Sequence, residues 1–273
     1  SNLASANVQT GSTLATLTGL SLGTSGNGGL STNYNALATT GSDFDVTARA
    51  ITLTADDRTK TYGDNLTLGS TAYTVSSGTV VSGDAISGVT LGSANSHAST
   101  LTSNAATYSD EITISAATGT GGFNSTNYTI TYAAGDLTVN PADLTLSGSR
   151  VYDGTTVIDG SELTATGVNG ETFSVTGSGD TSNLASANVQ TGSTLATLTG
   201  LSLGTSSNGG LSTNYNALAT AGSDFDVTAR AITLTATDVS QVYGDSDATL
   251  SVTASANGLA STDTLAEVTG TLT

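Results

Sequence analysis

The sequence of 273 residues contains no cysteine, no methionine and no tryptophan, and it has one proline and one histidine. The lack of cysteine excludes disulfide bonds, which many small secreted domains need for their stability. With one histidine and no cysteine, the chain also lacks the usual ligands of zinc and other transition metals. Calcium, which takes oxygen ligands only, is the metal left open.

Basic residues are scarce as well. Five Lys and Arg residues stand against 22 Asp and Glu residues, which gives a formal net charge of −17. Nucleic-acid backbones and anionic membrane surfaces are bound mainly through Lys and Arg, so we expect neither partner. No apolar run approaches the roughly 20 residues that a spanning helix needs, and we expect no membrane insertion in this segment.

The residues that are abundant favour β-structure. Short segments rich in Thr, Val, Ile and aromatic residues are separated by clusters of Gly, Asn, Ser and Asp, as is typical of strands and turns. The expected strands include AYTV at 72–75, EITIS at 111–115, YTITY at 128–132, TFSV at 172–175 and LATLTGLSL at 195–203. The one exception that we consider is a short helical turn at residues 84–87. The sequence therefore predicts an all-β protein.

The chain also repeats itself, which is typical of tandem architectures. Residues 1–55 match residues 182–236, and the pairs that differ are Gly26 with Ser207 and Thr40 with Ala221. A weaker half-period lies inside this repeat, because the tetrapeptide STNY recurs at 31–34, 125–128 and 212–215. The pattern predicts two alternating kinds of domain, each of about 90 residues.

The strand pattern slips at the joints between repeats. Phe44 and Val46 alternate with polar residues in one phase, and Ile51 and Leu53 alternate in the opposite phase. A slip of one residue turns every side chain to the other face of a sheet, so we expect two strands from two domains. At the middle joint, Pro141 cannot donate a ladder hydrogen bond and stiffens the connection. The expected domains are residues 1–48, 49–140, 141–229 and 230–273.

These domains are expected to form an elongated rod. Each is predicted to be an immunoglobulin-like β-sandwich, with a β-grasp-like fold as the alternative. A continuous solenoid is disfavoured because it would need an internal period near roughly 20 residues. The first and last segments are too short to bury a core alone, so we expect sequence outside these 273 residues, or another chain, to complete them.

Three tripeptides resemble the motifs of two known repeat families. Tyr62-Gly63-Asp64 and Tyr243-Gly244-Asp245 resemble the motif of the MBG repeat of the YGX type, and Tyr152-Asp153-Gly154 resembles that of the YDG repeat. The resemblance makes residues 1–48 the C-terminal part of a YDG-type repeat and 49–140 an MBG-type repeat. It likewise makes 141–229 a YDG-type repeat and 230–273 the N-terminal part of an MBG-type repeat.

Both repeats are found in very long bacterial surface adhesins of the filamentous-haemagglutinin type, secreted by two-partner systems, including biofilm-matrix adhesins. The resemblance implies an extracellular, structural role at the bacterial cell surface. The chain would be a stalk that projects an adhesive tip, or part of an extracellular filament for cell adhesion or biofilm, with neighbouring repeats of the same chain as its partners. The alternative is that the repeats themselves bind extracellular polysaccharide or associate laterally with other copies.

Few side chains could carry chemistry, and we expect no enzyme. His97 lies in the polar stretch SANSHAST and has no counterpart in the other repeats, so we interpret it as a solvated loop residue. The motif tyrosines are interpreted as structural, with a buried ring and a hydrogen-bonded hydroxyl. Aspartates gather near the joints, where they are either solvated turn residues or weak calcium ligands. The candidate ligands are Asp43, Asp45, Asp57, Asp64, Asp224, Asp226, Asp238 and Asp245.

Overall fold

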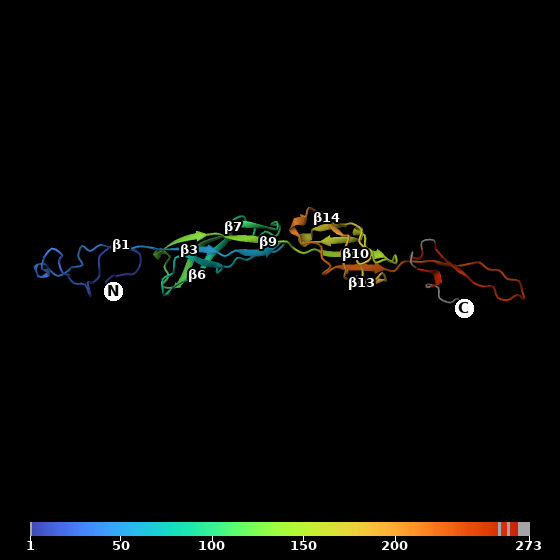
Figure 1. The fold of residues 1–273 in the computed structure, drawn as a ribbon, viewed down its shortest axis with the longest axis horizontal. Helices are drawn as coiled ribbons and strands as arrows, with labels where there is room; N and C mark the ends of the chain where they lie inside the picture. The colour runs from blue at the N-terminus through green and yellow to red at the C-terminus, as the bar shows by residue number, and fades with distance from the viewer. Residues whose placement is uncertain (1, 256–257, 261–262, 267–273) are drawn as a thin grey trace. The chain divides into compact units, whose positions relative to one another are not determined.

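A computed structural model of the chain describes residues 2–255, 258–260 and 263–266 (Figure 1). The chain divides into two compact units, and each is described by itself. Unit 1 contains Ser1–Lys60, Asn65–Ser99 and Thr107–Thr138. Unit 2 contains Thr61–Asp64, Thr100–Ala106 and Val139–Thr273. Two short segments that lie early in the sequence are therefore packed into unit 2.

The strands that lie wholly or mostly in unit 1 form three small sheets. β1 (Gln9–Ser12) and β2 (Phe44–Val46) make an antiparallel pair. The second sheet has the order β5 (Tyr73–Ser77), β3 (Arg49–Ala55), β8 (Tyr128–Ala133), with β3 parallel to β8. The third has the order β4 (Arg58–Thr61), β9 (Gly135–Asn140), β7 (Ala106–Gly121), β6 (Asp84–Ser93).

The core of unit 1 follows from the two-residue period of its strands. In β3, Ile51 and Leu53 are buried, whereas Thr52 between them is partly exposed. Ile112 of β7 and Leu137 of β9 are fully buried. Alternate side chains of a strand point to opposite faces, so the apolar residues of the two larger sheets gather in a shared interior.

Unit 2 is built on a six-stranded sheet, whose strands β10, β13 and β14 are labelled in Figure 1. Its order is β13 (Gln190–Ser193), β15 (Asp224–Thr228), β10 (Thr145–Val151), β11 (Leu163–Thr166), β12 (Thr172–Thr176), β14 (Ser202–Ser206). β10 is parallel to β15, and the other neighbours are antiparallel. Leu146, Phe173 and Phe225 are among its fully buried side chains.

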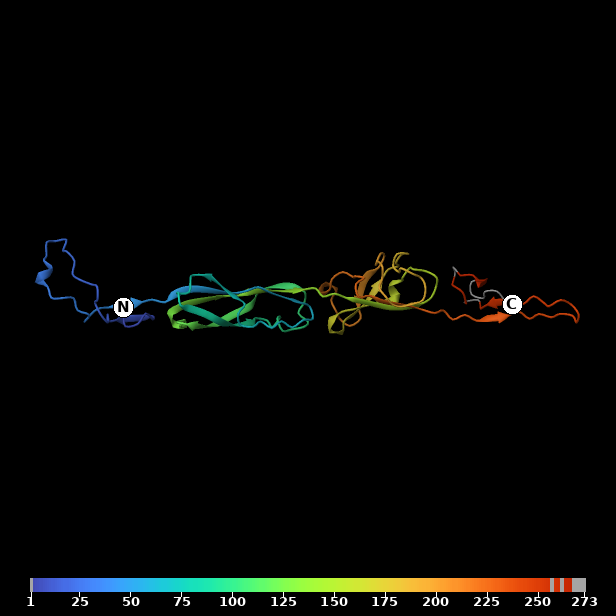
Figure 2. The same cartoon turned by 90° about the horizontal axis from the view of Figure 1, so that it is seen from below.

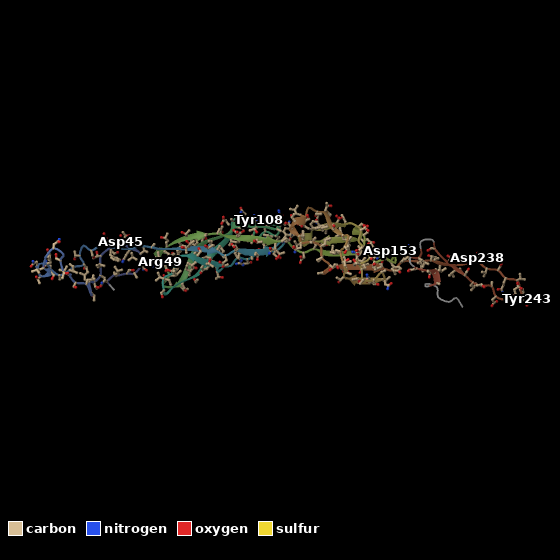
Figure 3. All side chains as sticks on the ribbon, in the orientation of Figure 1. Asp45, Arg49, Tyr108, Asp153, Asp238 and Tyr243 are labelled. Carbon is tan, nitrogen blue, oxygen red and sulfur yellow. The ribbon has the colours of Figure 1, made fainter. Side chains whose placement is uncertain are left out.

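A narrow two-stranded ribbon lies nearer the C-terminus. β16 (Leu234–Ala236) pairs antiparallel with β17 (Val252–Ala254), and Figure 2 shows the chain running out and back between these strands. Tyr243 lies at the tip of the ribbon in Figure 3, with its side chain fully exposed.

Each STNY tetrapeptide has the same local structure. Its first three residues form a single 3₁₀ turn, namely η1 (Ser31–Asn33), η2 (Ser125–Asn127) and η5 (Ser212–Asn214). The tyrosine that follows is extended, and its backbone N–H donates to the carbonyl oxygen of the serine. Two further 3₁₀ turns are η3 (Gly160–Glu162) and η4 (Val168–Gly170).

The all-β prediction is confirmed, as is the change of sheet at each joint. β2 and β3 are separated by two residues and belong to different sheets. β15 and β16, on the two sides of the third joint, are separated by five residues and also belong to different sheets. The immunoglobulin-like sandwich and the β-grasp-like alternative stay predictions.

Two local predictions were wrong. Residues 84–87, expected as a helical turn, begin β6, because the ladder with β7 satisfies their backbone groups. In the stretch 195–203, expected as one strand, only Ser202 and Leu203 belong to a strand. A turn interrupts it, since Leu201 N–H donates to the Leu198 carbonyl and Gly200 has a φ of 82°.

Candidate functional site

The most distinctive polar arrangement in unit 2 joins two tyrosines through one carboxylate. Tyr62 Oη donates to Glu171 Oε1 at 2.7 Å, and Tyr215 Oη donates to Glu171 Oε2 at 2.8 Å. Tyr62 comes from the early segment Thr61–Asp64, whereas Glu171 precedes β12 and Tyr215 ends the STNY tetrapeptide. We call these three residues the tyrosine clasp.

The clasp is packed as well as hydrogen-bonded. The rings of Tyr62 and Tyr215 meet edge to face with centroids 5.6 Å apart, and the rings of Phe173 and Tyr215 meet edge to face with centroids 5.2 Å apart. Both tyrosines are buried. Edge-to-face aromatic pairs and charge-assisted hydrogen bonds are each stronger than ordinary contacts of their kind. The clasp therefore holds the early segment firmly in unit 2.

Burial and the neighbouring carboxylate favour the neutral form of both phenols. Burial is the larger cause and the hydrogen bond to Glu171 the next, and together they raise the pKa of Tyr62 and of Tyr215 above the ordinary value of 10.0. A phenol held in its neutral form donates a hydrogen bond and does not act as a base or a nucleophile near neutral pH. The arrangement is suited to holding two segments of the chain together, and not to catalysis.

Glycine at position 63 is required by this close approach. Its φ is 92°, and a Cβ built there would lie 2.6 Å from Cγ2 of Val168. A positive φ and a missing side chain are both properties that only glycine offers without strain. The second residue of the Tyr62-Gly63-Asp64 motif thus lets the tyrosine reach Glu171.

A second arrangement uses the asparagine of STNY. Asn214, which is buried, accepts from the backbone N–H of Ala105 at 2.9 Å and donates through Nδ2 to Asn104 Oδ1 at 3.1 Å. Asn104 and Ala105 belong to the second early segment of unit 2, Thr100–Ala106. We call this pair of bonds the asparagine clasp.

Unit 1 contains the same asparagine clasp at another STNY. Asn127 Oδ1 accepts from the backbone N–H of Val8 at 2.9 Å, and Asn127 Nδ2 donates to Asn7 Oδ1 at 2.9 Å. In both units the asparagine side chain therefore forms two hydrogen bonds with an Asn-containing dipeptide from the preceding repeat. One side-chain amide satisfies a backbone donor and a side-chain acceptor together, which fixes register as well as contact.

A carboxylate also meets a tyrosine in unit 1. Tyr128 Oη donates to Asp84 Oδ2 at 2.6 Å, and the Tyr128 ring stacks on Phe123. Burial first, and then the bond to Asp84, raise the pKa of Tyr128. Near the C-terminus of unit 2, Tyr152 Oη donates to Asp263 Oδ1 at 3.0 Å. Among the described residues, tyrosines therefore donate to the carboxylates of Glu171, Asp84 and Asp263.

Three of the aspartates proposed as calcium ligands accept hydrogen bonds from backbone N–H groups. Asp45 accepts from Gly11 N–H at 2.7 Å, Asp226 accepts from Gly192 N–H at 2.8 Å, and Asp57 accepts from Asp136 N–H at 2.8 Å. The others, all exposed, are Asp43, Asp64, Asp224, Asp238 and Asp245. Figure 3 labels Asp45 and Asp238. Among the described residues, no three acidic or histidine side chains form a group that could hold a metal ion. Calcium binding stays a prediction.

His97 is less solvated than expected. Its ring is half-buried and stacks on Tyr108, which is labelled in Figure 3, with centroids 3.9 Å apart. The interpretation of this histidine as a solvated loop residue was therefore wrong as to burial, although the residue does lie in a turn. The stacked arrangement of His97 and Tyr108 buries part of the imidazole ring.

Comparison with known families now places the two central segments. A model of the MBG domain (YGX type) matches residues 51–138, and a model of the YDG domain matches residues 136–223. The chain is an MBG–YDG repeat region. MBG and YDG domains are found in the repeat regions of surface adhesins, and they are not known as enzymes. No curated protein and no solved structure matches the chain.

The two clasps can now be assigned to the domains. In unit 2, Tyr62 and Asn104 come from the MBG domain, whereas Glu171, Asn214 and Tyr215 come from the YDG domain. The structural interpretation of Tyr62 is confirmed by its buried ring and bonded hydroxyl. The same interpretation was wrong for Tyr243, because its side chain is fully exposed. In the part of the chain that the structure describes, no helix is long and apolar enough to cross a membrane.

Sequence reasoning missed the partners of the motif tyrosines. Glu171 is 109 residues from Tyr62, and no local pattern connects them. The recurrence of STNY was the one signal available for Asn127, Asn214, Tyr128 and Tyr215, because a tetrapeptide repeated in both kinds of domain points to a shared task. Asp84 and Asp263 carry no motif of their own.

Proposed function

We propose that this chain is part of the repeat region of a secreted bacterial adhesin, in which MBG and YDG domains form a stalk outside the cell. The stalk would project an adhesive tip or build an extracellular filament for cell adhesion or biofilm. Its partners would be the neighbouring repeats of the same chain. Chain length and resistance to unfolding are then the functional properties, and no reaction is involved.

The tyrosine clasp is the observation that carries this proposal. A ligand-binding site would leave polar groups free to meet a ligand, whereas Tyr62, Tyr215 and Glu171 satisfy one another. A stalk under load needs each domain to be tied to the next by more than a linker, and Tyr62 is an MBG residue held by YDG residues. The location of both families in surface adhesin repeat regions supports the extracellular setting.

The test is a replacement in the producing bacterium. Residues 51–223 of the adhesin are exchanged for an unrelated β-domain pair of similar length, and attachment and biofilm mass are compared with those of the parent strain and of a strain from which the segment is deleted. Each compact domain adds roughly 30–40 Å, so the exchange preserves reach.

We expect the exchanged stalk to support attachment and the shortened one to support less. Loss of attachment in the exchanged strain would contradict the stalk proposal, because it would mean that the MBG and YDG surfaces themselves bind polysaccharide or other copies. Protease accessibility of the segment on intact cells checks the extracellular location in the same strains.

A further inference from the structure

Two copies of one sequence occupy different environments in this chain. Phe44 corresponds to Phe225 and Tyr34 to Tyr215 in the repeat of residues 1–55 at 182–236. Phe44 is 44% exposed and Tyr34 70%, whereas Phe225 is 0% exposed and Tyr215 6%. Because the sequences differ at two positions only, the difference must come from what packs against each copy.

In unit 2 the covering segment is residues 141–181. Its strand β10 lies beside β15, which contains Phe225, with Gly148 opposite that residue in the register. Phe173 of β12 packs on the ring of Tyr215. In unit 1 the corresponding strand β2, which contains Phe44, belongs to a sheet of two strands, β1 and β2. The edge that β10 occupies in unit 2 therefore has no counterpart strand in that sheet.

A cavity of about 370 Å³ lies in unit 1 next to this edge. Val8, Arg49, Val81 and Asp84 are among the residues that line it. Val189 and Arg230, the counterparts of Val8 and Arg49 in the repeat, line a second cavity in unit 2 together with Ala260 and Asp263.

In the second cavity, a tyrosine of the YDG domain is hydrogen-bonded to an aspartate. Tyr152, the tyrosine of the YDG motif, lines it and donates its hydroxyl hydrogen to Asp263. Arg230 adds a bond from its guanidinium to the Tyr152 carbonyl oxygen at 3.4 Å. The residues lining the unit 1 cavity include no tyrosine that corresponds to Tyr152.

We propose that residues 2–48 and this cavity together form a docking site for a YDG segment equivalent to residues 141–181. The strand equivalent to β10 pairs alongside β2 and covers Phe44, and the tyrosine equivalent to Tyr152 enters the cavity and donates to Asp84. The proposal rests on the tandem-repeat architecture of the proposed function, but not on its adhesive role.

The chemistry of the cavity fits a second phenol. Asp84 already accepts from Tyr128 through Oδ2, and an ionised carboxylate accepts further donors through its other oxygen. Glu171 provides the precedent, since its two oxygens accept from two tyrosines. Arg49 occupies the position of Arg230 and is exposed, so its guanidinium can reach the backbone of an incoming strand. Docking would thus reproduce the tyrosine clasp at the YDG-to-MBG joint.

The experiment adds such a YDG segment to the whole chain in trans. A fluorescently labelled peptide with the sequence of residues 141–181 is titrated with the 273-residue protein, and binding is followed by anisotropy. We expect saturable binding of one peptide per chain, with new hydrogen-exchange protection of the β2 amides, Phe44–Val46. Absence of saturable binding would overturn the proposal.

Three variants locate the site. Phe44→Asp, at an exposed position, should abolish binding, and binding that persists in this variant would overturn the site because the peptide would then be exchanging into unit 2. Tyr152→Phe in the peptide and Asp84→Asn in the protein should each weaken binding about tenfold, as expected for one charge-assisted hydrogen bond. Full affinity in both variants would overturn the assignment of the tyrosine to the cavity.

Tyr243→Phe in the protein is the matched control, and we expect its affinity for the peptide to be unchanged. None of these results depends on attachment by cells, so failure here is distinguishable from failure of the stalk proposal.

Discussion

Tyr62 and Tyr215 meet edge to face and donate to the two oxygens of the same carboxylate, although the first belongs to an MBG domain and the second to a YDG domain. This relationship gives the motif tyrosine a structural role, because it links residues of the two domains. The MBG motif supplies a ring and a donor, and the YDG domain supplies the acceptor and the facing ring. Stability measurements can separate these contributions.

Removing the shared acceptor should have a large effect. In Glu171→Gln, both tyrosine hydroxyls lose a charged acceptor, so we expect the free energy of unfolding of unit 2 to fall by about 1–3 kcal/mol. Hydrogen exchange of the β12 amides, Thr172–Thr176, reports this free energy locally. Asp238→Asn, at an exposed position, is the control for the loss of one negative charge. Equal protection in the two variants would contradict the clasp.

The two copies of the MBG motif provide a matched pair of tyrosines. Tyr62→Phe should destabilise unit 2 by about 1 kcal/mol, because Glu171 loses one of its two donors. Tyr243→Phe should have no measurable effect, since the Tyr243 side chain is fully exposed. Denaturant unfolding measures the free energy of unfolding of both single variants. Similar losses of stability in both would contradict a stabilising role of the Tyr62 hydroxyl in the clasp.

The effect of replacing an STNY asparagine should depend on whether its side chain forms the asparagine clasp. Asn214→Ala leaves the Ala105 N–H without its acceptor, so we expect a loss of about 1–3 kcal/mol. Asn33→Ala changes the same position of another STNY, where the side chain is exposed, and should be neutral. Thermal unfolding distinguishes them. A neutral Asn214→Ala would mean that water replaces the amide without cost.

Stability should fall at alkaline pH. The pKa values of Tyr62, Tyr128 and Tyr215 are raised above 10.0 by burial and by hydrogen bonds to carboxylates. A raised folded-state pKa means that the folded chain holds these protons longer than the unfolded chain does. The stabilisation is therefore fully present below pH 10.0 and is lost as pH rises above it.

Ultraviolet titration of tyrosinate checks this expectation. Of the nine tyrosines, Tyr62, Tyr128 and Tyr215 should ionise last, and unfolding should accompany their ionisation. The Tyr62→Phe and Tyr215→Phe variants should each remove part of this late phase. A single common titration of all nine, without late-ionising groups, would contradict the burial of the clasp tyrosines.

Much of the fold was predictable because it depends on local patterns. Thr, Val and Ile with a two-residue period predict strands, and the change of phase between Val46 and Ile51 predicts a change of sheet. The helical turn at Asp84 failed because a short polar stretch has no period of its own, and pairing with β7 decided its conformation. The clasp partners could not be predicted, since Glu171 meets Tyr62 only through the tertiary fold.

The most direct test of the central claim is a double-mutant cycle between Tyr62 and Glu171, read from hydrogen exchange of the β12 amides. The claim is that an MBG tyrosine and a YDG carboxylate stabilise unit 2 together. The account predicts that the double variant Tyr62→Phe, Glu171→Gln is less destabilised than the sum of the single variants, with a coupling energy of about 1 kcal/mol. Additive losses would mean that the two side chains act independently, and the clasp would not be what ties the MBG segment into unit 2.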